Sequence, residues 1–286
     1  MLDGDNKTKQ GVTIEEEVLN KWETLQVILL SLNSVLVAYS GGVDSTLLLK
    51  AARDTLGEKA WAVTVKSKVH PQREVEEALQ VARGMGVEPL VVELSVLDHP
   101  AFVANPPDRC YHCKSLIFIR LKEIAREQGL AWVVEGSNRD DLGDYRPGRH
   151  ALEELGVRSP LLEAGLTKAE IRSLSRYLDL PTWDRPSLAC LASRFPYGTA
   201  LTAAALKQVE QAEAFLGELG LGQRRVRHHG DIARLEIEAV DWPILLENRQ
   251  RIVARLRELG YTYVAVDLAG YRTGSMNEVL EGRGER

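Results

Sequence analysis

The chain has 286 residues, of which 44% are hydrophobic and 27% charged, and its formal net charge is −5. This is the composition of a globular protein of one large or two smaller domains, whereas a general nucleic-acid-binding protein is usually basic. With 3 cysteines, no apolar leader and no stretch of the roughly 18 apolar residues that a membrane span needs, the sequence predicts a cytoplasmic protein without a disulfide framework.

Helices and strands alternate over the first two thirds of the chain. A capping box of Thr13 and Glu16 predicts the start of the first helix, and one of Thr167 and Glu170 predicts a later one. Short apolar runs predict strands at 34–39, 61–65, 90–94 and 132–135, with helices ending near 56 and covering 74–84, 113–128 and 167–178. This alternation predicts an α/β fold with a doubly wound parallel sheet.

The order of elements changes after Pro186. A helix at 202–220, strands at 225–228 and 233–237, a helix at 245–259 and a strand at 263–268 predict a smaller α+β domain. We therefore expect a flexible tail at 1–12, a large domain at 13–194 and a C-terminal domain at 195–286.

A glycine loop stands where the first core strand meets its helix. Residues 40–46 read Ser-Gly-Gly-Val-Asp-Ser-Thr, and a loop that opens a helix at the carboxyl end of a parallel strand is suited to bind phosphate. It has neither the lysine of a Walker A loop nor a dinucleotide fingerprint. Its alternative is an ordinary turn capped by serines. The candidate phosphate-binding residues are Ser40, Gly41, Gly42, Asp44, Ser45 and Thr46.

The order Ser-Gly-Gly-x-Asp-Ser resembles the pyrophosphate loop of the ATP pyrophosphatase (PP-loop) superfamily. The resemblance implies ATP cleavage between the α- and β-phosphates, with Asp44 helping to hold Mg²⁺. A second loop, Gly136–Asp141, follows another core strand, and its Asp141 is a candidate Mg²⁺ ligand. The superfamily usually meets the adenine and ribose at the end of the second strand. The further candidate ATP-binding residues are Lys66, Ser67, Gly136 and Asn138.

The three cysteines form a Cys-x-x-Cys pair, Cys110 and Cys113, and a distant Cys190. Four interpretations remain open: a zinc site completed by His112, a redox dithiol, three ligands of an iron–sulfur cluster, and buried apolar side chains.

Arginines gather near the start of the C-terminal domain. Arg225 and Arg227 share a face of the predicted strand because side chains alternate along it. With Arg194 and Arg272 they could clamp a phosphate, and a solvated basic strand is the alternative.

Longer stretches resemble the LarE family of ATP-dependent sulfur transferases over about residues 15 to 280. They are 40–45, 136–141, Asp-Tyr-Arg-Pro-Gly at 144–148, Ser-Arg-Phe-Pro-Tyr-Gly-Thr at 193–199, Val-Arg-His-His-Gly-Asp-Ile-Ala-Arg at 226–234, and Gly-Tyr-Arg-Thr-Gly-Ser-Met-Asn at 270–277. The first loop is typical of the whole superfamily. The stretches Ser-Arg-Phe-Pro-Tyr-Gly at 193–198 and Asp-Ile-Ala-Arg at 231–234 are more specific to the family.

The resemblance implies an enzyme in the biosynthesis of the nickel-pincer nucleotide, which is the cofactor of lactate racemase. ATP would adenylylate the carboxylates of pyridinium-3,5-biscarboxylic acid mononucleotide, and sulfur would convert them to thiocarboxylates. Cofactors would be ATP, Mg²⁺ and a [4Fe-4S] cluster on Cys110, Cys113 and Cys190, whose open iron takes sulfide from a sulfide or persulfide source. Without a cluster, Cys190 would be a sacrificial sulfur donor. The resemblance places the substrate phosphate at Ser193, Arg194, Arg225, Arg227 and Arg272.

By the same resemblance the C-terminal domain serves substrate binding and oligomerisation, in a homo-oligomer that is a hexamer in some members. Three rival functions remain. A tRNA thiolase of the superfamily should carry an extended basic surface. An ammonia-using synthetase should work without cysteines. A nucleotide-sensing module would bind ATP and release no pyrophosphate.

Overall fold

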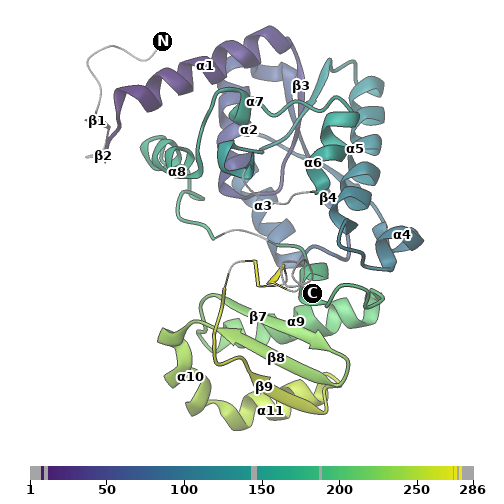
Figure 1. The fold of residues 1–286 in the computed structure, drawn as a ribbon. Helices are drawn as coiled ribbons and strands as arrows, with labels where there is room; N and C mark the ends of the chain where they lie inside the picture. The colour runs from purple at the N-terminus through teal and green to yellow at the C-terminus, as the bar shows by residue number, and fades with distance from the viewer. Residues whose placement is uncertain are drawn as a thin grey trace. The chain divides into compact units, whose positions relative to one another are not determined.

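A computed structural model describes residues 8–9, 12–142, 147–186, 189–272, 274–275 and 277–278. The chain forms two compact units (Figure 1). Unit 1 comprises Met1–Ser67, Gln72–Ser95 and Asp108–Leu188, and unit 2 comprises Lys68–Pro71, Val96–Pro107 and Ala189–Arg286. Two short upstream segments thus belong to the C-terminal unit. The domain boundaries at 12/13 and 194/195 stay predictions. The predicted motif at 144–148 lies largely outside the described residues.

Unit 1 contains a four-stranded sheet in the order β5-β4-β3-β6, with every neighbouring pair parallel. Its strands are β3 (Val35–Ala38), β4 (Ala60–Lys66), β5 (Leu90–Glu93) and β6 (Trp132–Val134). Its helices are α1 (Glu16–Leu32), α2 (Val43–Leu56), α3 (Gln72–Gly84), α5 (Arg109–Glu127), α6 (Pro147–Glu154), α7 (Pro160–Glu163) and α8 (Lys168–Tyr177). The predicted doubly wound parallel sheet is confirmed.

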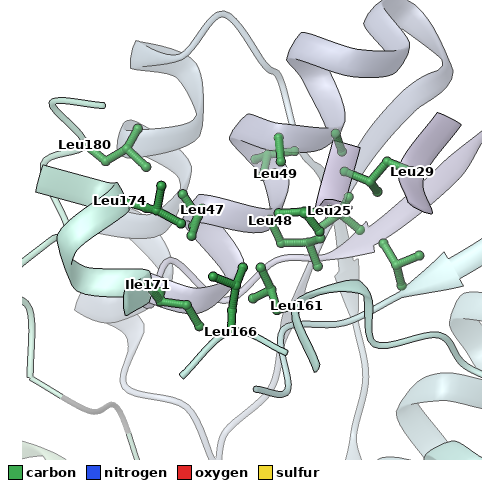
Figure 2. Close-up of a cluster of buried hydrophobic side chains, with 14 of the residues drawn as sticks. Leu25, Leu29, Leu47, Leu48, Leu49, Leu161, Leu166, Ile171, Leu174 and Leu180 are labelled. Atoms are coloured by element: carbon green, nitrogen blue, oxygen red, sulfur yellow. The ribbon is translucent and has the colours of Figure 1, made fainter. Parts of the chain in front are cut away.

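Each face of the sheet has its own apolar core. On β3, Val35 and Val37 join the cluster that α1, α2, α7 and α8 complete, while Leu36 joins the cluster of α5. Side chains of a strand alternate between faces, and a parallel sheet with both faces covered therefore needs a continuous apolar run. Figure 2 shows the first cluster, where Leu25 and Leu29 of α1 meet the leucines of α2.

The helix starts show where local signals hold and where they fail. The second capping box is confirmed, because the Glu170 N–H donates to Thr167 Oγ1 at 3.3 Å and the Thr167 N–H donates to Glu170 Oε2 at 2.8 Å. The first is wrong: α1 begins at Glu16 after Glu15, and Thr13 lies in β2 (Val12–Thr13), which pairs with β1 (Thr8–Lys9). Thr13 stands two positions before the N-cap residue Glu15, and a capping residue must itself occupy the N-cap position.

Unit 2 has a three-stranded sheet in which β8 pairs antiparallel with β7 and parallel with β9. Its elements are α4 (Pro100–Val103), α9 (Ala203–Glu218), β7 (Arg224–His229), β8 (Ile232–Ile237), α10 (Trp242–Glu247), α11 (Arg249–Glu258) and β9 (Tyr263–Val266). The single helix predicted at 245–259 is wrong, because Asn248 ends α10 and its side chain donates to the Ile244 carbonyl at 2.9 Å before α11 begins. Short 3₁₀ turns lie at Gly57–Lys59, Val96–Asp98, Arg139–Leu142, Leu191–Arg194 and Ala239–Asp241.

Across the described residues, no helix has the length and apolar character required to cross a bilayer.

Candidate active site

The glycine loop joins β3 to α2 and folds back on itself. Gly41 has φ +76° and Gly42 caps the helix at φ −74°. The Ser45 hydroxyl donates to the Gly42 carbonyl at 3.2 Å and accepts the Ser40 N–H at 3.3 Å, and the Ser40 and Ser45 hydroxyls lie 3.1 Å apart. The loop therefore presents a helix N-terminus, whose backbone N–H groups bind phosphate, and its two serine hydroxyls hold the turn.

Alanine at position 41 is expected to lower the free energy of unfolding by about 1–3 kcal/mol. A Cβ at Gly41 would stand 2.5 Å from the Cβ of Ala78 and 2.8 Å from its Cα, in a left-handed conformation that L side chains rarely adopt. The matched control is Gly42→Ala, whose Cβ would meet nothing nearer than Ser40 Oγ at 3.6 Å. Urea unfolding of both variants checks the prediction, and equal stabilities would contradict it.

The second predicted loop lies against the first. A Cβ on Gly136 would stand 3.1 Å from the Ser45 nitrogen and 3.3 Å from the Asp44 carbonyl carbon, so the two backbones are in close contact. The Asn138 side-chain amide donates to Asp44 Oδ1 at 3.2 Å. Asp141 Oδ2 accepts the backbone N–H of Asn138 at 2.9 Å, which fixes the 3₁₀ turn that follows.

Sequence reasoning missed Lys168. Its ammonium forms an ion pair with Asp44 Oδ2, and its backbone N–H donates to Asp140 Oδ2 at 2.9 Å. Lys168 is the first residue of α8, directly after the cap Thr167. The capping box could have pointed to Lys168, because it predicts a helix that starts after Thr167 and thus places Lys168 at the first helical position. The loop that lacks a Walker A lysine thus has a cation beside it from another element.

The carboxylates around the loop could supply only part of the ligand set of a Mg²⁺ ion. Asp44 is 22% exposed in its side chain and pairs with the Lys168 ammonium, while Asp140 accepts the backbone N–H of Lys168. Among the described residues, no group of three or more His, Cys, Asp or Glu side chains could by itself hold a metal ion. Mg²⁺ is usually held by one or two carboxylates together with substrate phosphates, and Asp44 suits that arrangement.

The two residues at the end of β4 differ in their contacts. The Lys66 ammonium donates to Glu93 Oε1 on the neighbouring strand at 3.0 Å. The Ser67 hydroxyl is buried and has no hydrogen-bond partner among the described residues. A buried polar atom without a partner costs free energy, so Ser67 is the residue here that a ligand hydroxyl would satisfy.

None of the three cysteines takes part in a disulfide in the described structure. Cys110 and Cys113 are the second and fifth residues of α5, where Cys110 is exposed and Cys113 is half-buried. Residues at this spacing share a helix face. Cys190 belongs to unit 2 and caps the 3₁₀ turn Leu191–Arg194.

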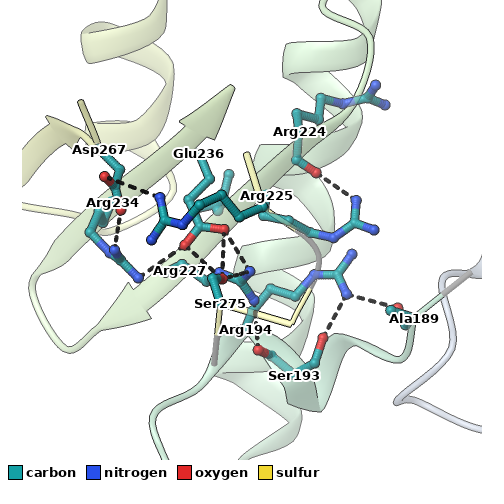
Figure 3. A network of polar contacts seen from close by, with 12 residues as sticks. Ala189, Ser193, Arg194, Arg224, Arg225, Arg227, Arg234, Glu236, Asp267 and Ser275 are labelled. Atoms are coloured by element: carbon teal, nitrogen blue, oxygen red, sulfur yellow. Dashed lines mark hydrogen bonds and ion pairs between the residues drawn. The ribbon is translucent and has the colours of Figure 1, made fainter. Parts of the chain in front are cut away.

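Two of the predicted phosphate ligands, Arg194 and Ser193, contact the turn that begins at Cys190 (Figure 3). Arg194 is 2% exposed and pairs with Glu213 through Nε at 2.9 Å and Nη2 at 2.8 Å. Its Nη1 donates to the carbonyls of Ala189 at 2.8 Å and Cys190 at 3.1 Å. The Ser193 hydroxyl also donates to the Cys190 carbonyl, at 2.8 Å.

Arg227 is engaged in a similar way (Figure 3). It is 4% exposed, and it donates to the Ser193 carbonyl at 2.8 Å, to Glu236 Oε2 at 2.6 Å and to the Ser275 hydroxyl at 2.8 Å. Glu236 is fully buried and also pairs with Arg234 at 3.0 Å. The network anchors the segment after Cys190 to β7 and β8.

Arg225 has a different environment. Its guanidinium lies over the Tyr271 ring at 5.2 Å and donates to the Arg224 carbonyl at 2.7 Å, and no carboxylate of the described residues forms an ion pair with it. Burial, and then the charge of Arg194, lowers the pKa of Arg225 below its usual range. A cation in this state gains most from an anion. Arg272 instead pairs with Glu278 at 3.0 Å.

The parallel sheet, the glycine loop and the facing asparagine and lysine define an ATP-using enzyme of the PP-loop class. The NAD synthase family profile matches residues 17–102. GMP synthase of Aeropyrum pernix is 27% identical over 52% of this chain and 32% of its own length.

Two relatives match nearly the whole chain. An uncharacterized protein of Synechocystis sp. is 41% identical over 91% of this chain and 98% of its own length. The pyridinium-3,5-bisthiocarboxylic acid mononucleotide synthase of Lactiplantibacillus plantarum is 40% identical over 91% of this chain and 95% of its own length. The chain therefore belongs to the LarE family of ATP-using, sulfur-transferring enzymes, and the predicted resemblance is confirmed.

Proposed function

We propose that the chain is a pyridinium-3,5-bisthiocarboxylic acid mononucleotide synthase. The observation that carries the proposal is the 40% identity to the Lactiplantibacillus plantarum enzyme of that name across both units. The loop geometry supports it, because a phosphate cradle, a carboxylate and a lysine are what an ATP-cleaving site needs. The substrate proposed is the corresponding biscarboxylic acid mononucleotide.

The proposed first step activates a carboxylate. A substrate carboxylate oxygen attacks the α-phosphorus of ATP, the bond to the β-phosphate oxygen breaks, and pyrophosphate leaves. The loop Ser40–Ser45 would hold the leaving phosphates, with Lys168 supplying positive charge and Asp44 a ligand for Mg²⁺. Ser67 would meet the ribose. The product is an acyl adenylate, whose AMP is a far better leaving group than oxide.

The proposed second step forms the thiocarboxylate. A sulfur nucleophile attacks the activated carbonyl carbon and AMP leaves. Arg225 would contact the substrate phosphate directly. The other proposed residues of this phosphate site are Ser193, Arg194, Arg227 and Arg272. Their side chains are already engaged, Ser193 with the Cys190 carbonyl and the arginines with Glu213, Glu236 and Glu278. The proposal includes a homo-oligomer, which light scattering of the purified protein tests.

The sulfur is proposed to come through a [4Fe-4S] cluster on Cys110, Cys113 and Cys190. The observation in its favour is that Cys110 and Cys113 share one helix face at the start of α5. Such a cluster supplies an iron that can hold added sulfide. The alternative is that Cys190 gives up its own sulfur. An anaerobic spectrum with iron and sulfide analysis separates them: an iron-free protein would exclude the cluster.

Replacing Cys190 with alanine is expected to abolish thiocarboxylate formation and to leave pyrophosphate release measurable, because adenylylation needs no thiol. Pyrophosphate and thiocarboxylate are measured in one reaction with ATP, the biscarboxylate mononucleotide and sulfide. Cys113→Ala is the companion variant. If the cluster is the sulfur carrier, both variants lose the product and the iron absorption; if Cys190 is sacrificial, Cys113→Ala keeps the product. No pyrophosphate from the wild-type protein would overturn the proposed function.

A further inference from the structure

The backbone of the glycine loop accepts a hydrogen bond from Arg185, a residue to which the proposed function gives no contact with ATP. Arg185 follows α8 in unit 1 and is 20% exposed in its side chain. Its Nη1 donates to the carbonyl of Gly41 at 3.0 Å, and its Nη2 donates to Glu77 Oε2 on α3 at 3.2 Å. One guanidinium therefore bridges the loop and α3.

This bridge fixes a donor of the loop. The carbonyl of Gly41 and the N–H of Gly42 belong to one trans peptide unit, in which they point in opposite directions. A guanidinium that holds the carbonyl thereby holds the Gly42 N–H in one orientation. That N–H lies at the N-cap of α2, where backbone N–H groups have no partner within the helix and bind anions.

Arg185 is itself held in place. Arg172 of α8 donates through Nη1 to the carbonyl of Trp183 and through Nη2 to the carbonyl of Arg185, both at 2.7 Å. Ala78 of α3, next to Glu77, is the residue that a Cβ on Gly41 would strike. Thus α3 contacts the loop through Ala78 and, by way of Glu77, through the guanidinium, while α8 fixes the position of that guanidinium.

We infer that Arg185, oriented by Glu77, is a positioning residue of the pyrophosphate loop: it sets the direction of the Gly42 N–H before ATP arrives. The inference rests on the proposed function, since it assigns phosphate binding to that loop. Arg185 and Glu77 also line a cavity of about 580 Å³ among α2, α3 and the end of α8, together with Arg53. The cavity gives a small molecule access to the same place.

The test measures binding of α,β-methylene-ATP with Mg²⁺, an analogue that cannot be cleaved at the bond in question. Arg185→Ala is expected to weaken binding about tenfold to hundredfold, the effect of losing a charged hydrogen bond. Millimolar guanidinium, which can enter the cavity, is expected to restore part of it. Arg185→Lys keeps the charge and cannot bridge both acceptors, so its affinity for the analogue is expected to lie between those of the wild type and Arg185→Ala. This variant replaces Arg185→Ala in the test if the alanine variant does not fold.

The matched control is Arg53→Ala, which removes an arginine from the same cavity that pairs with Glu58 at 2.8 Å and does not touch the loop. It should bind the analogue as the wild type does. Wild-type affinity in Arg185→Ala, or a loss of the same size in Arg53→Ala, would overturn the inference. A wild-type protein that does not bind the analogue would instead overturn the proposed function.

Glu77→Gln separates positioning from direct phosphate binding. If Glu77 orients Arg185 toward the loop, removing its charge weakens analogue binding. If the guanidinium bound phosphate itself, loss of the competing carboxylate would strengthen it. Unchanged or tighter binding in Glu77→Gln would therefore contradict the inference.

Discussion

Replacing Lys168 with alanine is expected to lower kcat/KM for pyrophosphate release by about 10²–10³-fold, the usual effect of removing one donor that stabilises a developing anion. The ammonium pairs with Asp44 of the glycine loop, at the place where the leaving pyrophosphate acquires charge in the proposed reaction. Lys168→Arg should retain part of the activity because it keeps a cation there. The measurement is steady-state pyrophosphate release.

The matched control is Lys21→Ala. Like Lys168, Lys21 forms an ion pair with a carboxylate. Its partner is Glu170 in the first turn of α8, at 2.6 Å, and none of its ion pairs in the described chain involves the glycine loop. Its loss should leave kcat/KM near that of the wild type. Equal activities of the two alanine variants would show that the Lys168 ammonium does not act on the phosphates.

Replacing Glu236 with glutamine is expected to destabilise the protein by about 3–5 kcal/mol, as when one partner of a buried ion pair is removed. Glu236 is fully buried and receives hydrogen bonds from Arg227 and Ser275. Glutamine has nearly the same shape, so the loss reports the uncompensated charge of Arg227 rather than a cavity. Urea unfolding measures it.

Glu278→Gln is the control for this second prediction. Glu278 pairs with Arg272 in the same unit, but it is exposed, and an exposed pair contributes little. Its denaturation midpoint should match the wild type. If Glu236→Gln did so as well, the network around Arg227 would not stabilise unit 2.

The arginines show what pattern reading could not decide. The sequence predicted that four arginines bind the substrate phosphate: Arg194, Arg225, Arg227 and Arg272. The structure engages Arg194 with Glu213, Arg227 with Glu236 and Arg272 with Glu278, and it pairs Arg225 with no carboxylate of the described chain. The acidic partners stand 19, 9 and 6 residues away in the sequence, and no local rule joins them.

Local sequence determined the parallel sheet and the glycine loop. Apolar runs of strand length, glycines at the strand–helix turn and the capping box at Thr167 act over a few residues, where backbone preference and burial of one face decide the outcome. Tertiary structure decided which charges meet. Lys168 reaches Asp44 across 124 residues and Arg185 reaches Gly41 across 144. Such contacts arise only after packing brings α8 and the segment behind it to the loop, because an ion pair depends on distance in space and leaves no periodic trace along the chain.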